Sequence, residues 1–432
     1  MRSLSLPIEA EVKARLDARL DAGARSPLAV ALSGGGDSLA LTLMAARWAK
    51  AHSRPLLVLT VDHGLQPDSA AWTQACARAA DRIGARFRGL TWTDPRPSGG
   101  LPAAARAARH RLLAQAAREA GARIILLGHT LDDIAEARAM RAAGSTTPSP
   151  REWAPSPAWP EGLDVFLLRP LLGIRREALR AWLRARGETW IEDPANTNLR
   201  FARSRARAAL AQPGGADPEA CAPGTDPPPL ADLALQVVAR PFGLQIARQA
   251  LREADPAAAR RFVAAACLSA AGGVRPPRGG ALDRLVERLA GPEAVRATLA
   301  GALVLSDAGG VTFGRTAGEM RRQGVEDLWL PAGGDGIFDG RFRIETTSPA
   351  RIRPLEGRLS RLSTADRAAL SSVPPALRGG LPGVETGRQF HLAGTPDSGV
   401  RVRPLARSRL LAACGVATDE ATAAALSLES SG

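Results

Sequence analysis

The hexapeptide SGGGDS at residues 33–38 has the residue types of a phosphate-binding loop. Glycines let backbone N–H groups approach an oxyanion, and the two serines add hydroxyl donors. The loop lacks the Gly-Lys-Ser/Thr ending of a Walker A loop and does not fit the GxGxxG dinucleotide fingerprint. A carboxylate among these amides would repel phosphate unless a divalent cation lay between them. The hexapeptide therefore predicts a phosphate cradle with a metal ion at Asp37, and the alternative is a capped glycine-rich turn. The cradle residues are Ser33, Gly34, Gly35, Gly36, Asp37 and Ser38.

A second acidic group follows in the segment HTLDDIAE at residues 129–136. Asp133 and Glu136 are spaced i, i+3, so on a helix they share a face. The functional interpretation is a carboxylate pair that faces the cradle and binds a cation. The alternative is that Asp132 and Asp133 stabilise the first turn of a helix, where negative charge is favourable.

Two groups of arginines could bind phosphate. Arg106 and Arg109 lie one helical turn apart, and four arginines with no acidic residue occupy residues 196–210. A basic helix at the edge of a domain can follow the phosphates of a nucleic acid. The alternative for both groups is a solvated basic face. The four arginines of the second group are Arg200, Arg203, Arg205 and Arg207.

Short apolar runs alternate with helical patterns over the first two hundred residues. Runs at 27–32, 56–62, 86–92 and 123–128 predict strands, and the patterns at 102–120 and 131–142 predict helices. This alternation predicts βαβ units and an α/β fold with a doubly wound parallel sheet. Ligands of such sheets bind beyond the carboxyl ends of the strands. The cradle and the acidic segment follow different strands at that edge, so they are expected to share one site.

The sequence predicts that the chain has four consecutive parts. We expect a catalytic domain at 1–210, a Pro/Gly-rich linker at 211–229, a mainly helical domain at 230–300 and a small mixed strand and turn region at 301–432. Residues 144–163, rich in proline and serine with two tryptophans, predict a long surface loop. Residues 165–171 predict one more strand, and residues 175–187 a helix.

The overall composition limits the possible partners. Among the 432 residues, 57 basic groups against 43 acids give a net charge of +14, which favours a polyanionic partner. Four distant cysteines without a CxxC pattern indicate neither a zinc ribbon nor a disulfide scaffold. No stretch reaches about 18 uninterrupted apolar residues, so no membrane span is expected. A cytoplasmic protein is expected, and its oligomeric state is not indicated.

Six segments in order resemble the tRNA(Ile)-lysidine synthetase family of the N-type ATP pyrophosphatases, which have a PP-loop. Together they cover roughly residues 25–210. They are SGGGDS (33–38), VDHGLQPDSA (61–70), AARAARHRLL (104–113), LGHTLDDIAEA (127–137), RPLLGIRREALRAWL (169–183) and IEDPANTNLRFARSRAR (191–207).

The resemblance implies an ATP- and Mg²⁺-dependent ligase that acts on an isoleucine tRNA with a CAU anticodon. The C2 oxygen of the wobble cytidine would attack the α-phosphate, releasing pyrophosphate, and free L-lysine would then displace AMP to form lysidine. It also implies that residues 33–38 bind ATP and that Asp37 lies near Mg²⁺. Asp133 and Glu136 would bind lysine and take part in catalysis, Arg106 or Arg109 would neutralise the adenylate, and the C-terminal domains would bind tRNA.

This sequence departs from the family pattern at several positions. Thr130 replaces the second histidine before the acids, Ala137 replaces a threonine after them, and His110 replaces an aromatic residue. Gly144-Ser145 and a Pro/Trp segment replace an Arg-Gly pair and a glycine-rich stretch. The cradle and the carboxylates are intact.

Three alternatives remain open. A PP-loop tRNA thiolase would need reactive or cluster-binding cysteines, but no cysteine lies beside a motif. An ammonia-using synthetase of the same class would leave the basic segment 196–210 without a role. A non-catalytic tRNA-binding relative would account for the changed segment after Arg141.

Overall fold

The computed structural model describes residues 8–194, 198, 200, 202–212, 230–387 and 389–429. The chain divides into two compact units. Unit 1 contains residues 1–228 and 418–424, and unit 2 contains residues 229–417 and 425–432. Most of the predicted linker, residues 213–229, lies outside the described residues, so the four-part division remains a prediction.

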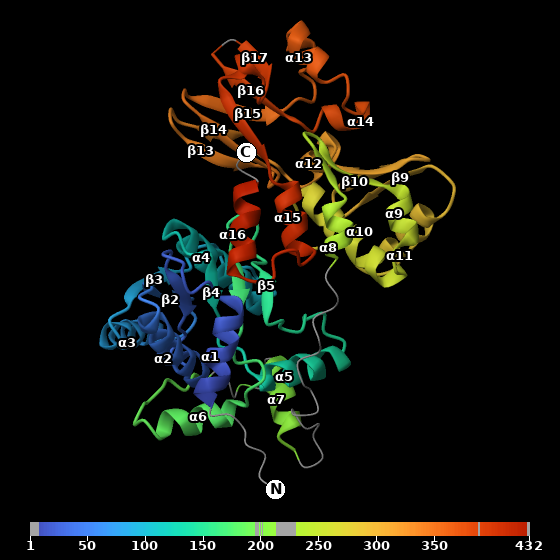
Figure 1. Cartoon of the computed structure of the whole chain (residues 1–432). Helices are drawn as coiled ribbons and strands as arrows, with labels where there is room; N and C mark the ends of the chain where they lie inside the picture. The colour runs from blue at the N-terminus through green and yellow to red at the C-terminus, as the bar shows by residue number, and fades with distance from the viewer. Residues whose placement is uncertain are drawn as a thin grey trace. The chain divides into compact units, whose positions relative to one another are not determined.

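Unit 1 is built on a six-stranded, mostly parallel sheet with the order β3-β2-β1-β4-β6-β5 (Figure 1). Only the last strand runs antiparallel to its neighbour. The order reverses between β1 and β4, which makes the edge beyond these two strands the expected place for a ligand. The strands are β1 Leu28–Ala31, β2 Leu56–Asp62, β3 Arg86–Thr91, β4 Ile124–Leu126, β5 Trp153–Pro155 and β6 Phe166–Leu168.

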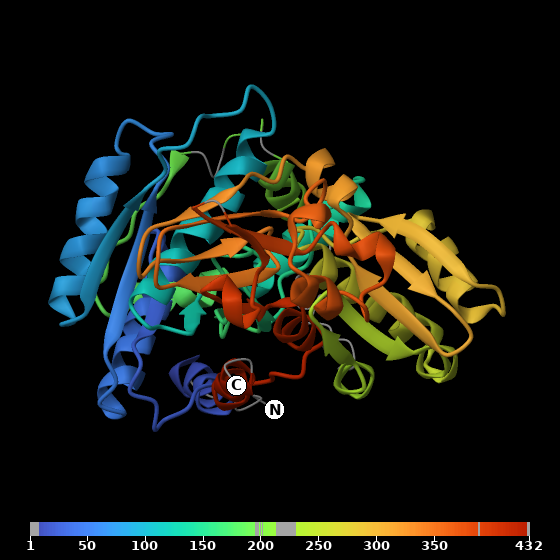
Figure 2. The ribbon, with the colours of Figure 1, turned by 90° about the horizontal axis from the view of Figure 1, so that it is seen from above.

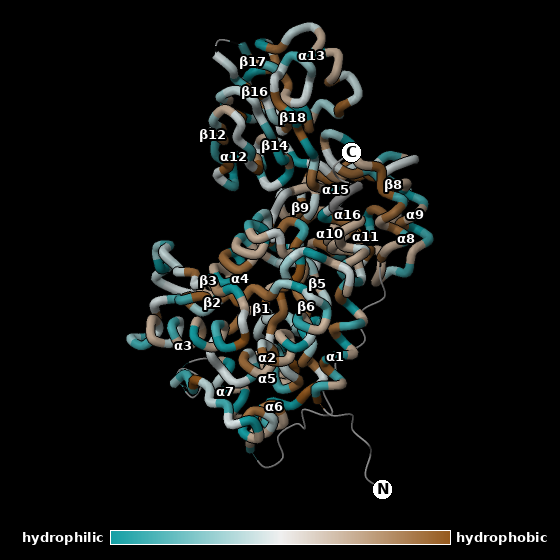
Figure 3. Tube along the Cα trace, turned by 60° about the vertical axis from the view of Figure 1, so that its left-hand side comes forward, coloured by the Kyte–Doolittle hydropathy of each residue, from teal (hydrophilic) through white to brown (hydrophobic). Residues whose placement is uncertain are grey.

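The central strands are almost entirely apolar because both faces of the sheet are covered. Val30, Val58 and Ile125 are fully buried, and Figure 3 shows the hydrophobic character of β1. The paired strands β2 and β3 run side by side in Figure 2. The predicted strands at 27–32, 56–62, 86–92 and 123–128 are thereby confirmed as β1 to β4. The helices of the unit are α1 Ile8–Arg19, α2 Gly36–Ala51, α3 Ser69–Arg82, α4 Leu101–Glu119, α5 Leu131–Ala142, α6 Arg176–Arg184 and α7 Ala202–Leu210.

The segment 144–163 differs from the predicted surface loop. Its residues Trp153–Pro155 form β5, which pairs with β6, and Trp153 stacks on Phe166 at a centroid distance of 5.1 Å. Trp153 and Trp159 are both buried. The prolines and serines hid the strand from the sequence pattern, but the two tryptophans bury enough apolar surface to fix the segment on the sheet.

Unit 2 contains three antiparallel sheets with the orders β7-β8-β11-β10-β9, β12-β15-β16-β17 and β13-β14-β18. The prediction of a mainly helical segment at 230–300 was incomplete, because β7, β8 and β9 fall within it. The strands are β7 Val238–Arg240, β8 Gly243–Ala247, β9 Val295–Leu299, β10 Ala302–Ser306, β11 Gly310–Gly314, β12 Leu328–Leu330, β13 Asp335–Phe338, β14 Phe342–Thr346, β15 Ala350–Pro354, β16 Pro382–Thr386, β17 Gln389–Leu392 and β18 Val400–Pro404. The helices are α8 Ala231–Leu235, α9 Arg248–Glu253, α10 Pro256–Ala271, α11 Gly280–Ala290, α12 Ala317–Arg322, α13 Thr364–Ala369, α14 Pro375–Arg378 and α15 Ala406–Ala413. Helix α16, Glu420–Glu429, begins in unit 1 and ends in unit 2.

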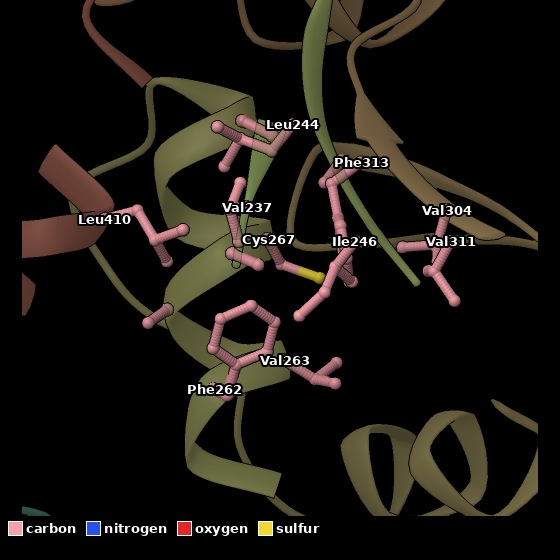
Figure 4. Close-up of a cluster of buried hydrophobic side chains, with 14 of the residues drawn as sticks. Val237, Leu244, Ile246, Phe262, Val263, Cys267, Val304, Val311, Phe313 and Leu410 are labelled. Carbon is pink, nitrogen blue, oxygen red and sulfur yellow. The ribbon is translucent and has the colours of Figure 1, made fainter. Parts of the chain in front are cut away.

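The largest core of unit 2 lies between α10 and the first sheet. Figure 4 shows Phe262 and Cys267 of α10 among aliphatic side chains, with Ile246 and Phe313 from the sheet. Burial raises the pKa of the Cys267 thiol to about 12. This thiol therefore acts as a small apolar core group.

Residues 418–424 belong to unit 1 although they follow unit 2 in the chain. Glu420 accepts hydrogen bonds from both terminal nitrogens of Arg54, at 2.7 and 2.5 Å. Both side chains are buried, and Arg54 also donates to the carbonyl oxygen of Ser26 at 2.8 Å. This ion pair anchors the C-terminal segment in unit 1. Across the described residues, no helix combines the length and apolarity needed to span a bilayer.

Candidate active site

The predicted phosphate cradle is the turn between β1 and α2. Gly34 has a φ of +85°, a conformation that glycine adopts without strain, and helix α2 begins at Gly36. The Ser38 hydroxyl donates to the carbonyl of Gly35 at 2.9 Å and accepts from the N–H of Ser33 at 3.2 Å. The serine thus shapes the turn, and the start of α2 directs its positive end toward the sheet edge.

Residues 187–191 cover one side of this turn. The N–H of Ile191 donates to the carbonyl of Gly34 at 3.0 Å, and a Cβ at Gly34 would lie 2.5 Å from the Ile191 side chain. A pocket of about 420 Å³ lies between this cover, the turn and α3. Neither Asp133 nor Glu136 lines it, so the acidic pair belongs to a different part of the site.

The acidic helix α5 begins next to the cradle because Gly128 allows a close approach. A Cβ at Gly128 would lie 3.0 Å from the backbone of Ser38. Asp133 then stabilises the first turn of α5, since its Oδ2 accepts from the N–H of Thr130 at 2.6 Å and from its hydroxyl at 2.9 Å. Asp132 caps the following helix instead, accepting from the N–H of Arg176 at 2.8 Å. Asp133 therefore has the capping contacts of the alternative interpretation, whereas Asp132 is bonded to another helix, and Asp133 keeps its Oδ1 for a further contact.

One guanidinium joins the cradle to the acidic helix. Arg176, the first residue of α6, donates from Nε to Asp37 Oδ2 at 3.0 Å and from Nη1 to Glu136 Oε1 at 3.0 Å. Its Nη2 donates to Asp133 Oδ1 at 3.2 Å. The structure therefore brings Asp37, Asp133 and Glu136 together around a single cation.

Helix α7 adds two more cations to the same acidic pair. Arg203 donates from Nε to Glu136 Oε2 at 2.7 Å and from Nη2 to Asp133, and Arg207 donates from Nε to Glu136 Oε1 at 2.8 Å. With Arg176, three guanidinium groups balance three carboxylates. An incoming cation must therefore compete with arginine for these oxygen atoms.

The electrostatics differ between the carboxylates. Burial raises the pKa of Asp37, and Arg176 offsets this only in part. Burial also acts to raise the pKa of Glu136, but the hydrogen bond from Arg207 and the charge of Arg176 outweigh it and lower that pKa. Glu136 is therefore firmly ionised, while Asp37 is an incompletely compensated carboxylate.

Asp37 has the features of a cation ligand. Its Oδ1 is buried and has no hydrogen-bond partner. Within the described ranges, no group of three His, Cys, Asp or Glu residues is arranged to hold a metal. A single carboxylate suits Mg²⁺, which commonly completes its shell with water and substrate phosphates.

A second basic cluster, which includes Arg106, Arg109 and Arg169, lies near Asp133. Burial, followed by the charges of Arg106 and Arg203, lowers the pKa of Arg109 to about 10. Arg169 donates from Nε to His129 Nδ1 at 3.1 Å. Since Arg169 occupies the Nδ1 lone pair, the proton of the neutral His129 ring lies on Nε2. These groups form a largely buried electropositive cluster whose charge would favour a phosphate.

The histidines of this cluster are neutral near pH 7. Burial lowers the pKa of His129 and of His110 well below the usual value, and the nearby arginines lower both further. Burial and the charge of Arg109 also lower the pKa of His63, which follows β2. His63 and His129 are thus near the same arginine at the expected sheet edge.

The four predicted tRNA-binding arginines have two kinds of environment. Arg203 and Arg207 face the acidic pair, whereas Arg200 and Arg205 are exposed, and Arg205 donates to the carbonyl of Arg200 at 2.9 Å. The sequence analysis did not single out Arg176 or Arg169. Both lie in the segment RPLLGIRRE at residues 169–177, which overlaps the end of the predicted strand at 165–171.

The described cysteines offer no reactive thiol. Cys76, Cys267 and Cys414 are free and buried, and burial raises the pKa of each thiol. Thiolates react and bind metals, so these environments disfavour both roles. Cys221 lies outside the described residues.

Comparisons with known proteins agree with this geometry. Residues 8–213 match the family model described as a PP-loop domain. A tRNA(Ile)-lysidine synthase from Caulobacter vibrioides is 46% identical over 427 residues, covering 95% of this chain and 98% of the relative. One from Methylobacterium nodulans is 36% identical over 349 residues, covering 72% of this chain and 97% of the relative. Among solved structures, a U34-tRNA thiolase from Methanococcus maripaludis has 18% identity and a TM-score of 0.39, covering 46% of this chain and 71% of its own, which is too distant to carry an argument.

Proposed function

Since this chain belongs to the tRNA(Ile)-lysidine synthase family of ATP-dependent ligases, we propose that it adenylates the wobble cytidine of a CAU-anticodon isoleucine tRNA and joins free L-lysine to it. The observation that carries the assignment of the site is the convergence of Asp37, Asp133 and Glu136 on Arg176. It puts the phosphate cradle beside a pair of carboxylates able to bind an ammonium group.

ATP is proposed to bind with its phosphates along residues 33–38. The N–H groups at the start of α2 and the hydroxyl of Ser33 would donate to phosphate oxygens. The free Oδ1 of Asp37 fits a Mg²⁺ ion, which would reduce the negative charge on the phosphates when bound. Arg106 and Arg109 would stabilise the phosphate of the adenylated base.

Adenylation converts the C2 oxygen of cytidine into a good leaving group. The oxygen on C2 of cytidine is a poor leaving group, so an amine cannot displace it directly. Attack of this oxygen on the α-phosphate forms an O–P bond and releases pyrophosphate. Attack of the lysine ε-nitrogen on C2 then forms a C–N bond, and the oxygen leaves with AMP.

The second step requires a neutral amine. With a pKa of about 10.4, the lysine ε-amine is neutral in roughly 1 molecule in 2,500 at pH 7, a cost near 4.6 kcal/mol. Asp133 and Glu136 would position the ammonium but favour its charged form. A base must therefore accept the proton as the amine attacks, and Glu136 or Asp133 is the proposed acceptor.

The tRNA is proposed to contact the exposed basic side of α7 and unit 2. Arg200 and Arg205 are exposed there, and the net charge of +14 favours a polyanion. Residues 230–300 and 301–432 are proposed to bind the tRNA body. A cytoplasmic location remains a prediction of the cysteine pattern.

The departure from the family pattern at Thr130 is compatible with catalysis, since this threonine donates two hydrogen bonds to Asp133.

The test of the proposed function incubates the full chain with ATP, Mg²⁺, L-lysine and the CAU tRNA, and then analyses the tRNA nucleosides by mass spectrometry. Lysidine should form only when all four are present. A sulfur-containing product would favour a thiolase, and unchanged nucleosides with tRNA binding retained would favour a non-catalytic relative.

A further inference from the structure

We propose that Arg176 is a positioning residue that couples nucleotide binding to lysine binding. The inference rests on the proposed function, in which Asp37 serves the nucleotide and Asp133 and Glu136 serve lysine. Within the part of the chain that the structure describes, Arg176 is the cation that pairs with Asp37 and also with both lysine-site acids. Helix α6 therefore holds one group that responds to both substrates.

The oxygen atoms of the lysine site are already engaged. Oδ2 of Asp133 accepts from Thr130, and its Oδ1 accepts from Arg176 and Arg203. Both oxygens of Glu136 accept from arginine, with Arg176 and Arg207 sharing Oε1. An ammonium group has three donors and would need these same oxygens. The four oxygens offer about eight acceptor positions and already accept seven hydrogen bonds, so three ammonium donors require a guanidinium to move away.

Moving Arg176 has a cost beyond the lysine site. Its departure would leave Asp37 without its only ion pair among the described residues. The Asp37 carboxylate is largely buried, with 20% of its side chain exposed, and an unpaired buried carboxylate is strongly unfavourable. This cost opposes lysine binding as long as Asp37 depends on Arg176.

Mg²⁺ with ATP would remove that cost. A cation at Asp37 replaces the charge that Arg176 supplies, and the adjacent phosphates offer the released guanidinium a new anionic partner. Lysine should then bind more tightly when Mg²⁺ and nucleotide are present. By linkage, lysine must strengthen nucleotide binding by the same factor.

Arg203 offers a comparison with Arg176, because it pairs with the same two lysine-site acids. It pairs with Asp133 and Glu136, and among the ion pairs of the described residues it has none with Asp37. Replacing it should relieve competition for the lysine site equally with and without nucleotide. Only a change at Arg176 should alter the dependence of lysine affinity on nucleotide.

The test measures the Kd of L-lysine for the full chain by isothermal titration calorimetry, with and without Mg²⁺ and α,β-methylene-ATP, which cannot be cleaved at the α-phosphate. For the wild type, nucleotide should lower the lysine Kd by about 5- to 150-fold, the usual range of coupling between sites. We call the ratio of the lysine Kd without nucleotide to the lysine Kd with nucleotide the coupling factor. In Arg176→Gln the coupling factor should fall toward one, mainly because lysine binds better without nucleotide. In Arg203→Gln the lysine Kd should fall in both conditions and the factor should stay at the wild-type value.

Two further variants make the result decisive. Arg184→Gln changes an exposed arginine of the same helix that pairs with Glu177, and it should leave the factor unchanged. Arg176→Lys keeps the charge if the Gln variant fails to fold, but a single ammonium cannot span three carboxylates, so its factor should also fall. Full coupling in a folded Arg176 variant would overturn this inference alone. No lysine binding to the wild type under either condition would overturn the proposed lysine site and this inference with it.

Discussion

The carboxylates of Asp37 and Glu136 are bonded to one guanidinium, that of Arg176, at 3.0 Å each. Asp37 lies in the first turn of α2, after β1, and Glu136 lies in α5, after β4. β1 and β4 are neighbours in the sheet, and the strand order reverses between them. The relationship therefore follows from the topology: the two segments that follow β1 and β4 at one switch point bring Asp37 and Glu136 to a shared cation, the Arg176 guanidinium.

Replacing Asp37 should abolish turnover without abolishing tRNA binding. Asp37→Ala removes the carboxylate whose buried Oδ1 has no hydrogen-bond partner. We expect a fall in kcat of about 100-fold or more, the scale for losing one electrostatic contact in a transition state. Pyrophosphate release measures turnover, and filter binding measures tRNA affinity. Asp81→Ala on the exposed side of α3 is the control, and normal turnover in Asp37→Ala would refute the cation assignment.

The affinity for tRNA should depend strongly on salt. If 6–10 phosphates are neutralised, affinity should fall by roughly 10³–10⁵ between 50 and 200 mM salt, and somewhat less for single-stranded contacts. Arg200→Gln should reduce the slope of log affinity against log salt by about one if this exposed arginine contacts a phosphate. A flat salt response would remove the polyanion interpretation of the net charge.

The free energy of unfolding should fall as the pH drops below about 6.5, because two buried histidines are neutral in the folded state. Burial, and then the charges of the neighbouring arginines, lower the pKa of His110 and of His129 in the folded state. Between the folded pKa and the unfolded value of about 6.5, the unfolded chain binds more protons, so acid favours unfolding. Each histidine should contribute up to about 1.4 kcal/mol per pH unit in this range.

Urea unfolding at pH 7.5, 6.5 and 5.5 measures this effect. His129→Gln should show a shallower loss of unfolding free energy than the wild type, and comparing the two cancels the other titrating groups. His52→Gln, whose ring contacts Trp48 outside the arginine cluster, is the control. Equal slopes for wild type and His129→Gln would contradict a neutral buried His129.

The C-terminal segment should stabilise unit 1 through the Arg54–Glu420 pair. Breaking a buried ion pair by removing one partner typically costs about 3–5 kcal/mol. Glu420→Gln should therefore lower the unfolding free energy on that scale, while Arg54→Met with Glu420→Leu should cost less because no charge is left unpaired. Lys13→Gln, in the exposed Lys13–Asp17 pair, should cost under about 1 kcal/mol. A similar loss of unfolding free energy from breaking either pair would contradict the anchoring role of the Arg54–Glu420 pair.

Much of unit 1 could be predicted because its signals are local. Apolar runs such as 56–62 fix a buried strand, and the glycines and serines of 33–38 suit one kind of turn. The rule that ligands bind beyond the carboxyl ends of parallel strands then places Asp37 and the acids of α5 in one region from the sequence alone. The family resemblance is confirmed by the near full-length relative.

The features that the sequence did not predict depend on tertiary contacts. Nothing local in RPLLGIRRE distinguishes Arg176 from its neighbours, since its role comes from three carboxylates on other elements. The inward direction of Arg203 and Arg207 had a usable signal, because their i, i+4 spacing puts them on one face of α7, apart from Arg205. The strand at 153–155 could not be predicted, because prolines obscure a pattern that packing against β6 completes.

The most direct test of the shared site separates the two half-reactions in Glu136→Gln. Pyrophosphate release with ATP, Mg²⁺ and the CAU tRNA reports adenylation, and AMP release on adding lysine reports the second step. The variant should still adenylate, but its lysine-dependent AMP release should fall by about 100-fold or more, while Glu119→Gln in an exposed ion pair should match the wild type. AMP release at the wild-type rate in Glu136→Gln, or none from the wild type itself, would contradict the account.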